Sequence, residues 1–531
     1  MWTVTLILYT ITLVFFILLY KKYVKKLFNE LIKNFNIKLR NGEKDVNFND
    51  HKYIEENLKD VSDICGPRSV PFLGTTWIYF WKYKMTKIHE VYKDLHETYG
   101  PIVVERTGSG FPIVSLYDRD DIDKVLRYPS KYPFRPPTEI IAFYRKSRPD
   151  RYASVGLPNA QGQEWEHLRS NLTGGLTNRK TLLAFLPTLN IICDDFIELI
   201  RHKRDMNGVI ENFQDIANLM GLETVCCLML GRRIGYLSKD FKDERFMALA
   251  TAVKRLFILQ RDAYFGNGLW KYIPTTTYKE FAKTEDIIYN IISEIVNETR
   301  NENLDCQTDD IKNIFLDILK NQDLDIRDRI AGIIDFIAAG IETLAHTLSF
   351  FFYFITQNDS FQNQIYDEFS YCGSEIDIEA LTNAHFTKAC IHESYRLCPT
   401  AFCIARILED DFILSDYKLK AGTFVLCQTA VACQDDQNFK NAKQFIPQRW
   451  MDGNKFNVNK GGVGANLVLP FGIGKRTCPG KKYIEIELNL VIAKLLKEFK
   501  VEFVGELETV FEFLIAPKTP VNVRFTDRET I

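Results

Sequence analysis

Long stretches of helical hydrophobic periodicity constrain the fold of this chain more than any other feature. Beyond Trp165, apolar residues recur at helical spacing over residues 182–201, 213–230, 245–259, 278–299, 327–356 and 484–499. Extended runs are short, as at 102–105, 113–116, 423–426 and 521–524, and the first two predict a hairpin. Strands and helices do not alternate, which excludes a doubly wound sheet. The sequence therefore predicts a mainly α fold with small β-sheets.

Charge and cysteine content narrow the class of protein. Lys plus Arg (67) nearly balance Asp plus Glu (69), so the chain lacks the basic excess of a protein that binds nucleic acid. Its 12 cysteines are scattered and form no CxxC pair, the spacing that zinc and dithiol sites use. A chain of 531 residues needs no disulfides to hold its core, so most cysteines are expected to be reduced, small, buried hydrophobes. No nucleic-acid partner is expected.

The amino terminus carries an uncharged apolar run from Trp2 to Tyr20. As a helix this run would span about 28 Å, close to the hydrocarbon thickness of a bilayer. A lysine cluster follows it directly: Lys21, Lys22, Lys25 and Lys26. The positive-inside rule places such a cluster on the cytoplasmic side. A cleaved secretory signal is the alternative, but no small-residue cleavage site is evident. We therefore expect residues 1–21 to form a transmembrane anchor in the lipid bilayer.

Residues 22–65 form a basic segment with two interpretations. Apolar residues recur at helical spacing among lysines, with Glu30 the only acid before Glu43. Such a pattern is typical of a linker helix on a membrane surface, and it also occurs in mitochondrial addresses. Prolines at 67 and 71 then stop helices and stiffen the connection. We expect a basic linker over 22–65 and a catalytic body over 66–531. The anchor favours the endoplasmic reticulum, and the mitochondrial inner membrane is the alternative.

A cysteine on a glycine-framed loop carries the chemical information. Cys478 lies in the sequence Phe471-Gly472-Ile473-Gly474-Lys475-Arg476-Thr477-Cys478-Pro479-Gly480, just before a helix predicted from about residue 483. The helix dipole and nearby amides favour a thiolate, and the glycines let the backbone approach a flat ligand. Arg476 is placed to pair with an anionic edge of that ligand. A buried structural cysteine is the other interpretation.

This loop has the pattern FxxGxRxCxG, and in it the chain resembles the cytochrome P-450 family, which shares every fixed position. The resemblance continues from Gly66 through nearly the whole body in the same order. It implies a cytochrome P-450 fold, here preceded by an N-terminal transmembrane helix, and a haem-thiolate monooxygenase. The cofactor would be heme b (iron protoporphyrin IX), with Cys478 as the axial iron ligand and Phe471 and Gly480 as cofactor-binding residues.

The segment Ala339-Gly340-Ile341-Glu342-Thr343 lies in the middle of the helix predicted over 327–356 and resembles the oxygen-activating element of the family. Gly340 is expected to leave room beside the cofactor. The Thr343 hydroxyl can bond back toward the Ala339 carbonyl and open a groove. The resemblance implies that Glu342 and Thr343 are catalytic residues that relay protons during oxygen activation. Without it, these residues would be packing and surface positions.

Glu393 and Arg396 match the ExxR element of the family, with the two charges one helical turn apart and able to pair. The resemblance implies that they form a buried structural network with Arg449, behind the haem loop. This network would stabilise the fold and take no direct part in catalysis.

Further arginines match positions that hold the cofactor in the family. Trp165 and Arg169 match the WxxxR element, and Arg406 follows Pro399 at the spacing of another family arginine. Together with Arg476, these side chains are expected to bind the two haem propionates by charge-assisted hydrogen bonds.

A separate electron donor is required, because the sequence has no convincing flavin or nicotinamide fingerprint. In the mitochondrial clan of the family a ferredoxin docks on basic residues, and Lys388, Lys481 and Lys482 match positions of that kind. His392 departs from the pattern, since a second lysine usually stands there and histidine is largely neutral at its unperturbed pKa. A ferredoxin and a flavoprotein reductase are both candidate donors.

The body resembles the mitochondrial clan of animal enzymes, and residues 144–154 and 193–199 are similar to its ecdysone-hydroxylating members. This implies a steroid hydroxylase that uses dioxygen, with ecdysone oxidised at C20 to 20-hydroxyecdysone, the moulting hormone. A large apolar substrate would bind at the family's substrate positions: Phe336, Ala338, Ala401, Phe402, Leu514 and Ile515. Aromatic stripes are, however, usually core.

Other functions stay open on the same sequence. A monooxygenase of this fold could clear xenobiotics or inactivate other sterols. A haem-binding sensor without catalysis would be expected to lack Glu342 or Thr343, and both are present. A purely structural, membrane-tethered protein would bind no haem.

Overall fold

The structure, a computed structural model, describes residues 58–71, 73–108, 110–239, 241, 243–266, 268–302, 313–451 and 464–528. The transmembrane helix expected over 1–21 and most of the linker expected over 22–65 lie outside these residues. The body expected over 66–531 is described over most of its length.

Helices make up most of the described body. The α-helices are α2 (Ile88–Tyr99), α3 (Arg119–Leu126), α4 (Glu139–Ser147), α5 (Gly162–Leu172), α6 (Gly174–Thr177), α7 (Arg179–Lys203), α8 (Phe213–Leu230), α9 (Glu244–Tyr264), α10 (Thr276–Glu302), α11 (Asn313–Lys320), α12 (Ile326–Ile355), α13 (Asp359–Phe369), α14 (Ile378–Asn383), α15 (His385–Leu397), α16 (Thr429–Ala432) and α17 (Lys481–Glu498). Each long segment of predicted helical periodicity is therefore confirmed as a helix.

Helix α7 begins before its periodic apolar residues, and side-chain caps mark the starts of α7 and α12. The Asn178 side chain accepts from the Lys180 amide at the start of α7, and Asp325 accepts from the Arg327 amide at the start of α12. Gly231 follows α8 with φ 69°, a left-handed conformation that favours glycine and ends the helix. Apolar periodicity reports the buried stripe of a helix, so it does not locate the ends of α7, although it does locate those of α8.

The strands form small sheets, as predicted. They are β1 (Lys59–Asp60), β2 (Ile102–Arg106), β3 (Pro112–Leu116), β4 (Val209–Ile210), β5 (Ile404–Ile407), β6 (Phe412–Leu414), β7 (Tyr417–Leu419), β8 (Phe424–Cys427), β9 (Phe499–Val504), β10 (Thr509–Phe511), β11 (Ile515–Pro517) and β12 (Asn522–Asp527). The sheets have the orders β2-β3-β8-β5, β1-β7-β6, β4-β12-β9 and β10-β11. The predicted hairpin is confirmed, because β2 and β3 pair antiparallel with Val104 opposite Val114.

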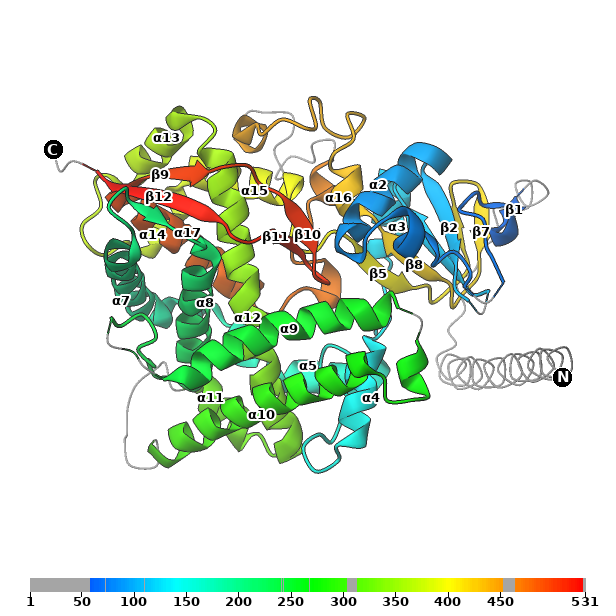
Figure 1. Ribbon diagram of the computed structural model, residues 1–531, viewed down its shortest axis with the longest axis horizontal. Coiled ribbons are helices and arrows are strands. Elements are labelled where there is room, and N and C mark those ends of the chain that lie inside the picture. The colour runs from blue at the N-terminus through cyan, green and yellow to red at the C-terminus, as the bar shows by residue number, and fades with distance from the viewer. Residues whose placement is uncertain are drawn as a thin grey trace, which may run out of the picture.

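Helix α12 runs through the middle of the molecule, and the long helices α9 and α10 lie side by side (Figure 1). Helix α8 crosses α12 closely. A Cβ on Gly221 of α8 would lie 2.9 Å from the Ile341 carbonyl oxygen, and one on Gly340 would lie 2.8 Å from a methyl of Val225. Glycine at both positions therefore lets the two helix backbones approach. The β2-β3-β8-β5 sheet and α2 lie at the end of the molecule opposite α7 and α13 (Figure 1).

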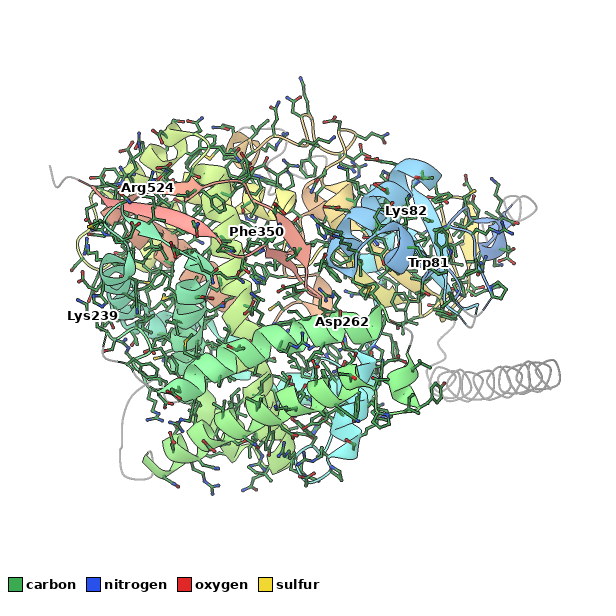
Figure 2. All side chains as sticks on the ribbon, viewed as in Figure 1. Trp81, Lys82, Lys239, Asp262, Phe350 and Arg524 are labelled. Atoms are coloured by element: carbon green, nitrogen blue, oxygen red, sulfur yellow. The ribbon has the colours of Figure 1, made fainter. Side chains whose placement is uncertain are left out.

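Among the described residues, α8 and α12 are long and apolar enough to cross a membrane by length and composition. Both are core helices, since 89% and 61% of their apolar windows are buried inside the protein. Figure 2 shows Phe350 of α12 in the middle of the molecule, and its side chain is 1% exposed. These two helices are therefore apolar because their side chains form the core of the protein.

Residues 58–65, which the sequence assigned to the linker, already pack on the body. Strand β1 pairs parallel to β7, with Lys59 opposite Tyr417. Ile64 is buried, and the Cys65 carbonyl accepts from the Val104 amide at 3.0 Å. The packed structure thus begins before Gly66.

Candidate active site

Cys478 lies on a tight loop that ends where α17 begins. Gly472 and Gly474 both have φ 70°, in the left-handed region that favours glycine, and they turn the chain on either side of Ile473. The Cys478 amide donates to the Phe471 carbonyl at 2.8 Å and closes the loop. Backbone geometry thus holds the cysteine at the N-terminus of a long helix.

The electrostatic environment of Cys478 suits a metal-bound thiolate. The residue is exposed, yet the surrounding atoms desolvate it and raise the pKa of its thiol above the ordinary value. The amides of Gly480 and Lys481 and the Arg169 guanidinium act in the opposite sense and stabilise the thiolate. An accessible sulfur held by amides fits an iron ligand, because the metal cation supplies the remaining stabilisation of the anion.

Four arginines gather beside the cysteine loop: Arg135, Arg169, Arg406 and Arg476. Desolvation lowers the pKa of each, to about 10 for Arg135 and about 9 for Arg476, and neighbouring guanidinium charges add to the effect at these two. None of the four forms a salt bridge with a carboxylate among the described residues. A desolvated cationic cluster without acidic partners is a site for a dianion, and the two propionates of heme b fit it.

Two of the predicted arginines, Arg169 and Arg476, are held in the cluster by contacts between α5 and the cysteine loop. Arg476 donates to the Pro133 carbonyl (2.9 Å) and to Gln161 Oε1 (3.0 Å), and its guanidinium carbon lies 4.0 Å from the centre of the buried Trp165 ring. Arg169 donates to the Thr477 carbonyl at 2.8 Å, next to the cysteine. The Trp165 ring therefore packs against the Arg476 guanidinium, and Arg169 connects α5 to the cysteine loop.

Removing one of the desolvated arginines is expected to weaken haem retention without unfolding the protein. Arg476→Leu and Arg135→Leu should each speed haem transfer to a haem-free acceptor protein by about tenfold to a hundredfold, because each loses a charge-assisted bond worth about 1.5–3 kcal/mol. Arg119→Leu, at a surface arginine whose side chain is 35% exposed and pairs with Asp120, is the matched control. Release rates equal to the control would contradict the assignment of the cluster to the propionates.

The middle of α12 shows the local geometry that the sequence suggested at Thr343. The Thr343 hydroxyl donates to the Ala339 carbonyl at 2.9 Å, as predicted. Ala339 is exposed although it lies on the central helix, so other side chains leave this turn of α12 uncovered. The expectation that Gly340 leaves room beside a cofactor is wrong. Successive helix positions differ by about 100°, so Gly340 points at Val225 of α8 while Ala339 and Thr343 share another face.

Glu342 does not join Thr343 in the structure. Its carboxylate is buried against α8, where Asn218 Nδ2 lies at 3.3 Å and Gln214 Nε2 at 3.5 Å. His346, one turn further along α12, brings its Nε2 to 3.0 Å from Glu342 Oε2. The two residues that the sequence grouped as a proton relay therefore lie in different surroundings.

The ion pair expected from the ExxR element is present. Arg396 donates to Glu393 at 2.8 Å and 2.9 Å, and both side chains are fully buried. Glu393 also accepts from Arg449 Nε (3.2 Å) and from the Trp450 indole (2.9 Å). Arg396 donates further to the carbonyls of Cys433 and Ala442. The network joins α15 to the segment that precedes the cysteine loop.

The structure brings together some of the predicted substrate residues. The Ile515 amide donates to the Thr400 carbonyl at 2.8 Å, which places the 401–402 and 514–515 pairs beside each other. Phe402 is 8% exposed, because its ring packs on Tyr92 and Phe511, so it is mainly a core residue. Phe336 and Ala338 are partly buried on α12 and pack against the main helical core. Strand β11 also packs on α12.

Two residues near the site, Arg135 and His346, were not predicted from the sequence. Arg135 belongs to no periodic or motif pattern, and only its apolar neighbours Phe134 and Pro136 suggest that the side chain is partly buried. Its guanidinium donates to the Pro158 carbonyl at 2.6 Å and 3.1 Å, so a loop contact sets its position. His346 was detectable, since it follows Glu342 at the i,i+4 spacing of a helical pair.

A groove of about 390 Å³ lies behind the cysteine loop, and all the basic residues predicted for donor docking line it. Lys388, Lys481 and Lys482 lie here with the apolar residues Leu182 and Leu381. His392 also lines the groove, where desolvation, Lys481 and Lys388 lower its pKa. It is therefore neutral at physiological pH, as expected, and the lysines carry the positive charge.

Comparison with known proteins agrees with the fold and the cysteine loop. A model of the cytochrome P450 family matches residues 66–525. The chain is therefore a haem-thiolate monooxygenase and belongs to the cytochrome P450 family, which binds heme b through a cysteine thiolate.

Its relatives are animal enzymes. The chain is 56% identical to the ecdysone 20-monooxygenase of Drosophila melanogaster over 482 residues, 88% of this chain and 89% of the relative. It is 29% identical to the mitochondrial cytochrome P450 302a1 of the same organism, over 84% of this chain and 91% of the relative. It is 26% identical to the mitochondrial 1,25-dihydroxyvitamin D(3) 24-hydroxylase of Mus musculus, over 83% of this chain and 84% of the relative.

Proposed function

We propose that this enzyme hydroxylates ecdysone at C20 to give 20-hydroxyecdysone. The observation that carries the proposal is the high identity to the Drosophila ecdysone 20-monooxygenase across nearly the whole of both chains. A steroid also suits the mostly apolar set of substrate residues, Phe336, Ala338, Ala401, Phe402, Leu514 and Ile515. One oxygen atom of dioxygen enters the C–H bond and the other leaves as water, with two electrons and two protons consumed.

In this proposal the residues of the chain have separate tasks. Cys478 would hold the iron through its thiolate, Arg135, Arg169, Arg406 and Arg476 would bind the propionates, and Phe471 and Gly480 would shape the loop. Heme b, when bound, supplies the activation of dioxygen. The Thr343 hydroxyl, which donates to the Ala339 carbonyl, can exchange that bond for one to a donor or acceptor bound beside this turn of α12. Thr343 would thereby hold a proton beside the cofactor, and Glu342 would supply protons to it after leaving its contacts with α8.

Turnover of ecdysone by the purified holoenzyme tests the substrate. Ecdysone is expected to give a type I spectral shift and a C20-hydroxylated product with at least one of two donors, a ferredoxin with its reductase or a flavoprotein reductase. A panel of sterols and xenobiotics is the comparison. Binding of the panel without binding of ecdysone would reject the proposal in favour of xenobiotic clearance or inactivation of other sterols, and haem binding without turnover of any compound would favour a sensor.

We assign the groove behind the cysteine loop to the electron donor, with an acidic ferredoxin preferred. The support is the positive charge of Lys388, Lys481 and Lys482 around an apolar floor, next to the loop that carries Cys478. Some of this charge is tied to the protein itself, because Lys388 donates to the Thr382 carbonyl at 2.6 Å and Lys481 lies 3.8 Å from Glu485. A flavoprotein reductase is the second candidate, and the donor comparison above separates the two.

We also assign the protein to a membrane, with residues 1–21 as anchor, 22–65 as linker and 66–531 as the enzyme. Support within the body comes from large apolar side chains that are exposed between α9 and α10 and near residue 81: Trp81 (73%), Leu269 (47%), Tyr272 (59%) and Ile273 (57%). The two segments meet where the Tyr79 ring lies 5.5 Å from that of Phe265. An exposed apolar face of this kind suits a lipid surface. Imaging of the full-length tagged chain separates the endoplasmic reticulum from the mitochondrial inner membrane.

A further inference from the structure

A buried polar cluster surrounds Glu342 on the α8 side of α12. Glu342 and His346 are 1% and 2% exposed, and their Oε2 and Nε2 atoms lie 3.0 Å apart. From α8, Gln214 and Asn218 direct their amide NH₂ groups at the same carboxylate, at 3.5 Å and 3.3 Å. The Glu342–His346 cluster, defined as these four residues, thus holds one carboxylate by one titratable group and two neutral donors.

The cluster has capacity for a further proton. Gln214 Oε1, Asn218 Oδ1 and both ring nitrogens of His346 are buried and have no hydrogen-bond partner among the described residues, so the 3.0 Å approach of His346 Nε2 to Glu342 is a charge contact that a small ring rotation would turn into a hydrogen bond. A buried acceptor without a donor costs free energy, about 1–3 kcal/mol. After a flip of the Gln214 or Asn218 side-chain amide, a protonated Glu342 carboxyl could donate its O–H to the amide oxygen. Ionised and protonated forms of Glu342 are therefore both accommodated without leaving the pocket.

Charges from other elements also face the cluster. Helix α8 presents only the neutral Gln214 and Asn218 to Glu342. From the β10–β11 hairpin, Glu512 interacts electrostatically with both His346 and Glu342, and from α9 Lys254 and Arg261 interact with Glu512. Desolvation is the main cause that raises the pKa of Glu512, and His346 and these two cations oppose the rise. Glu512 is half-buried, so this carboxylate near the cluster is partly open to solvent.

We propose that His346 is a positioning residue for oxygen activation, which holds ionised Glu342 against α8 and returns a proton to it when Thr343 needs one. The proton leaves His346 Nε2 and binds Glu342 Oε2. Imidazolium and carboxylate become imidazole and carboxylic acid, so the step creates no net charge in a buried site. Once neutral, Glu342 is no longer held by a cation and is free to serve Thr343, the next residue along α12. The task of Glu342 as proton donor belongs to the proposed function, and the role of His346 rests on it.

His346→Gln in the full-length holoenzyme tests the proposal. Glutamine keeps a polar side chain of similar length and cannot exchange a proton. The expected result is a fall of about tenfold in the fraction of reducing equivalents that reach hydroxylated product, with the balance released as hydrogen peroxide. The solvent deuterium isotope effect should rise, and the pH dependence of this fraction should lose one limb. Haem loading and the carbon monoxide spectrum should stay unchanged. His202→Gln, at an exposed histidine, is the matched control.

A double variant distinguishes positioning from a merely structural role. If His346 acts through Glu342, then His346→Gln should have little further effect in a Glu342→Gln background. Additive losses, or a pH profile equal to that of the wild type, would overturn the proposal. If His346→Gln does not accumulate as holoenzyme, Asn218→Leu removes another donor to the same carboxylate and should lower coupling in the same direction. Peroxide release can be measured without substrate, so failure of ecdysone as substrate would be seen separately.

Discussion

Cys478→Ser is expected to abolish the thiolate signature of the haem enzyme. The carbon monoxide complex of the reduced protein should lose the red-shifted Soret band, because a serine hydroxyl cannot donate charge to iron as a thiolate does. Hydroxylation should fall at least about 10³-fold, equivalent to about 4 kcal/mol of barrier. The readouts are the carbon monoxide difference spectrum and product formation per haem.

The matched control for this prediction is Cys65→Ser, because Cys65 is also exposed but contributes only its backbone to the β2 edge. It should leave spectrum and turnover unchanged. A red-shifted band retained in Cys478→Ser would contradict the ligand assignment and direct attention to another cysteine. Desolvation raises the pKa of the Cys478 thiol, so binding to iron should release a proton and haem loading should strengthen as pH rises.

Sequence patterns predicted those parts of the fold and site that depend on neighbours within one element. Helix α8 has the bounds that its apolar run indicates, and the hairpin of β2 and β3 was evident from two short β-rich runs around a glycine turn. The bond from Thr343 to the Ala339 carbonyl and the pair of Glu393 with Arg396 follow from helix spacing alone. In each case the residues that interact lie within one helix or one hairpin.

Contacts between elements far apart in the sequence were not predictable in the same way. Glu342 meets Gln214 and Asn218 because α8 crosses α12, and Gly340 faces Val225 for the same reason. Arg135 reaches the cationic cluster from a loop whose shape depends on the Pro158 carbonyl. Helical periodicity gives the angle of a residue around its own axis, but not the identity of the helix that packs there. Those assignments required the three-dimensional structure.

Glu393→Gln is expected to destabilise the protein strongly, although glutamine has the same number of non-hydrogen atoms as glutamate and nearly the same shape. Arg396 is 0% exposed and Arg449 is 3% exposed, and Glu393 is the carboxylate that both contact. Loss of its charge leaves two buried guanidinium groups without an anion. Breaking a buried pair costs about 3–5 kcal/mol, a large part of the roughly 5–15 kcal/mol that stabilises a typical native protein. Thermal and denaturant unfolding of the holoenzyme, and its yield, measure the effect.

Glu498→Gln is the matched control, because Glu498 also accepts from an arginine, Arg201 at 2.7 Å, but is 39% exposed. A surface pair contributes at most about 1 kcal/mol, so the two variants should differ by several-fold in their loss of stability. The cost at Glu393 comes from the unpaired charges rather than from a missing attraction, so adding Arg396→Met to Glu393→Gln should recover part of it. A double variant no more stable than Glu393→Gln alone would show instead that the carbonyls of Cys433 and Ala442, which Arg396 also bonds, hold this region together.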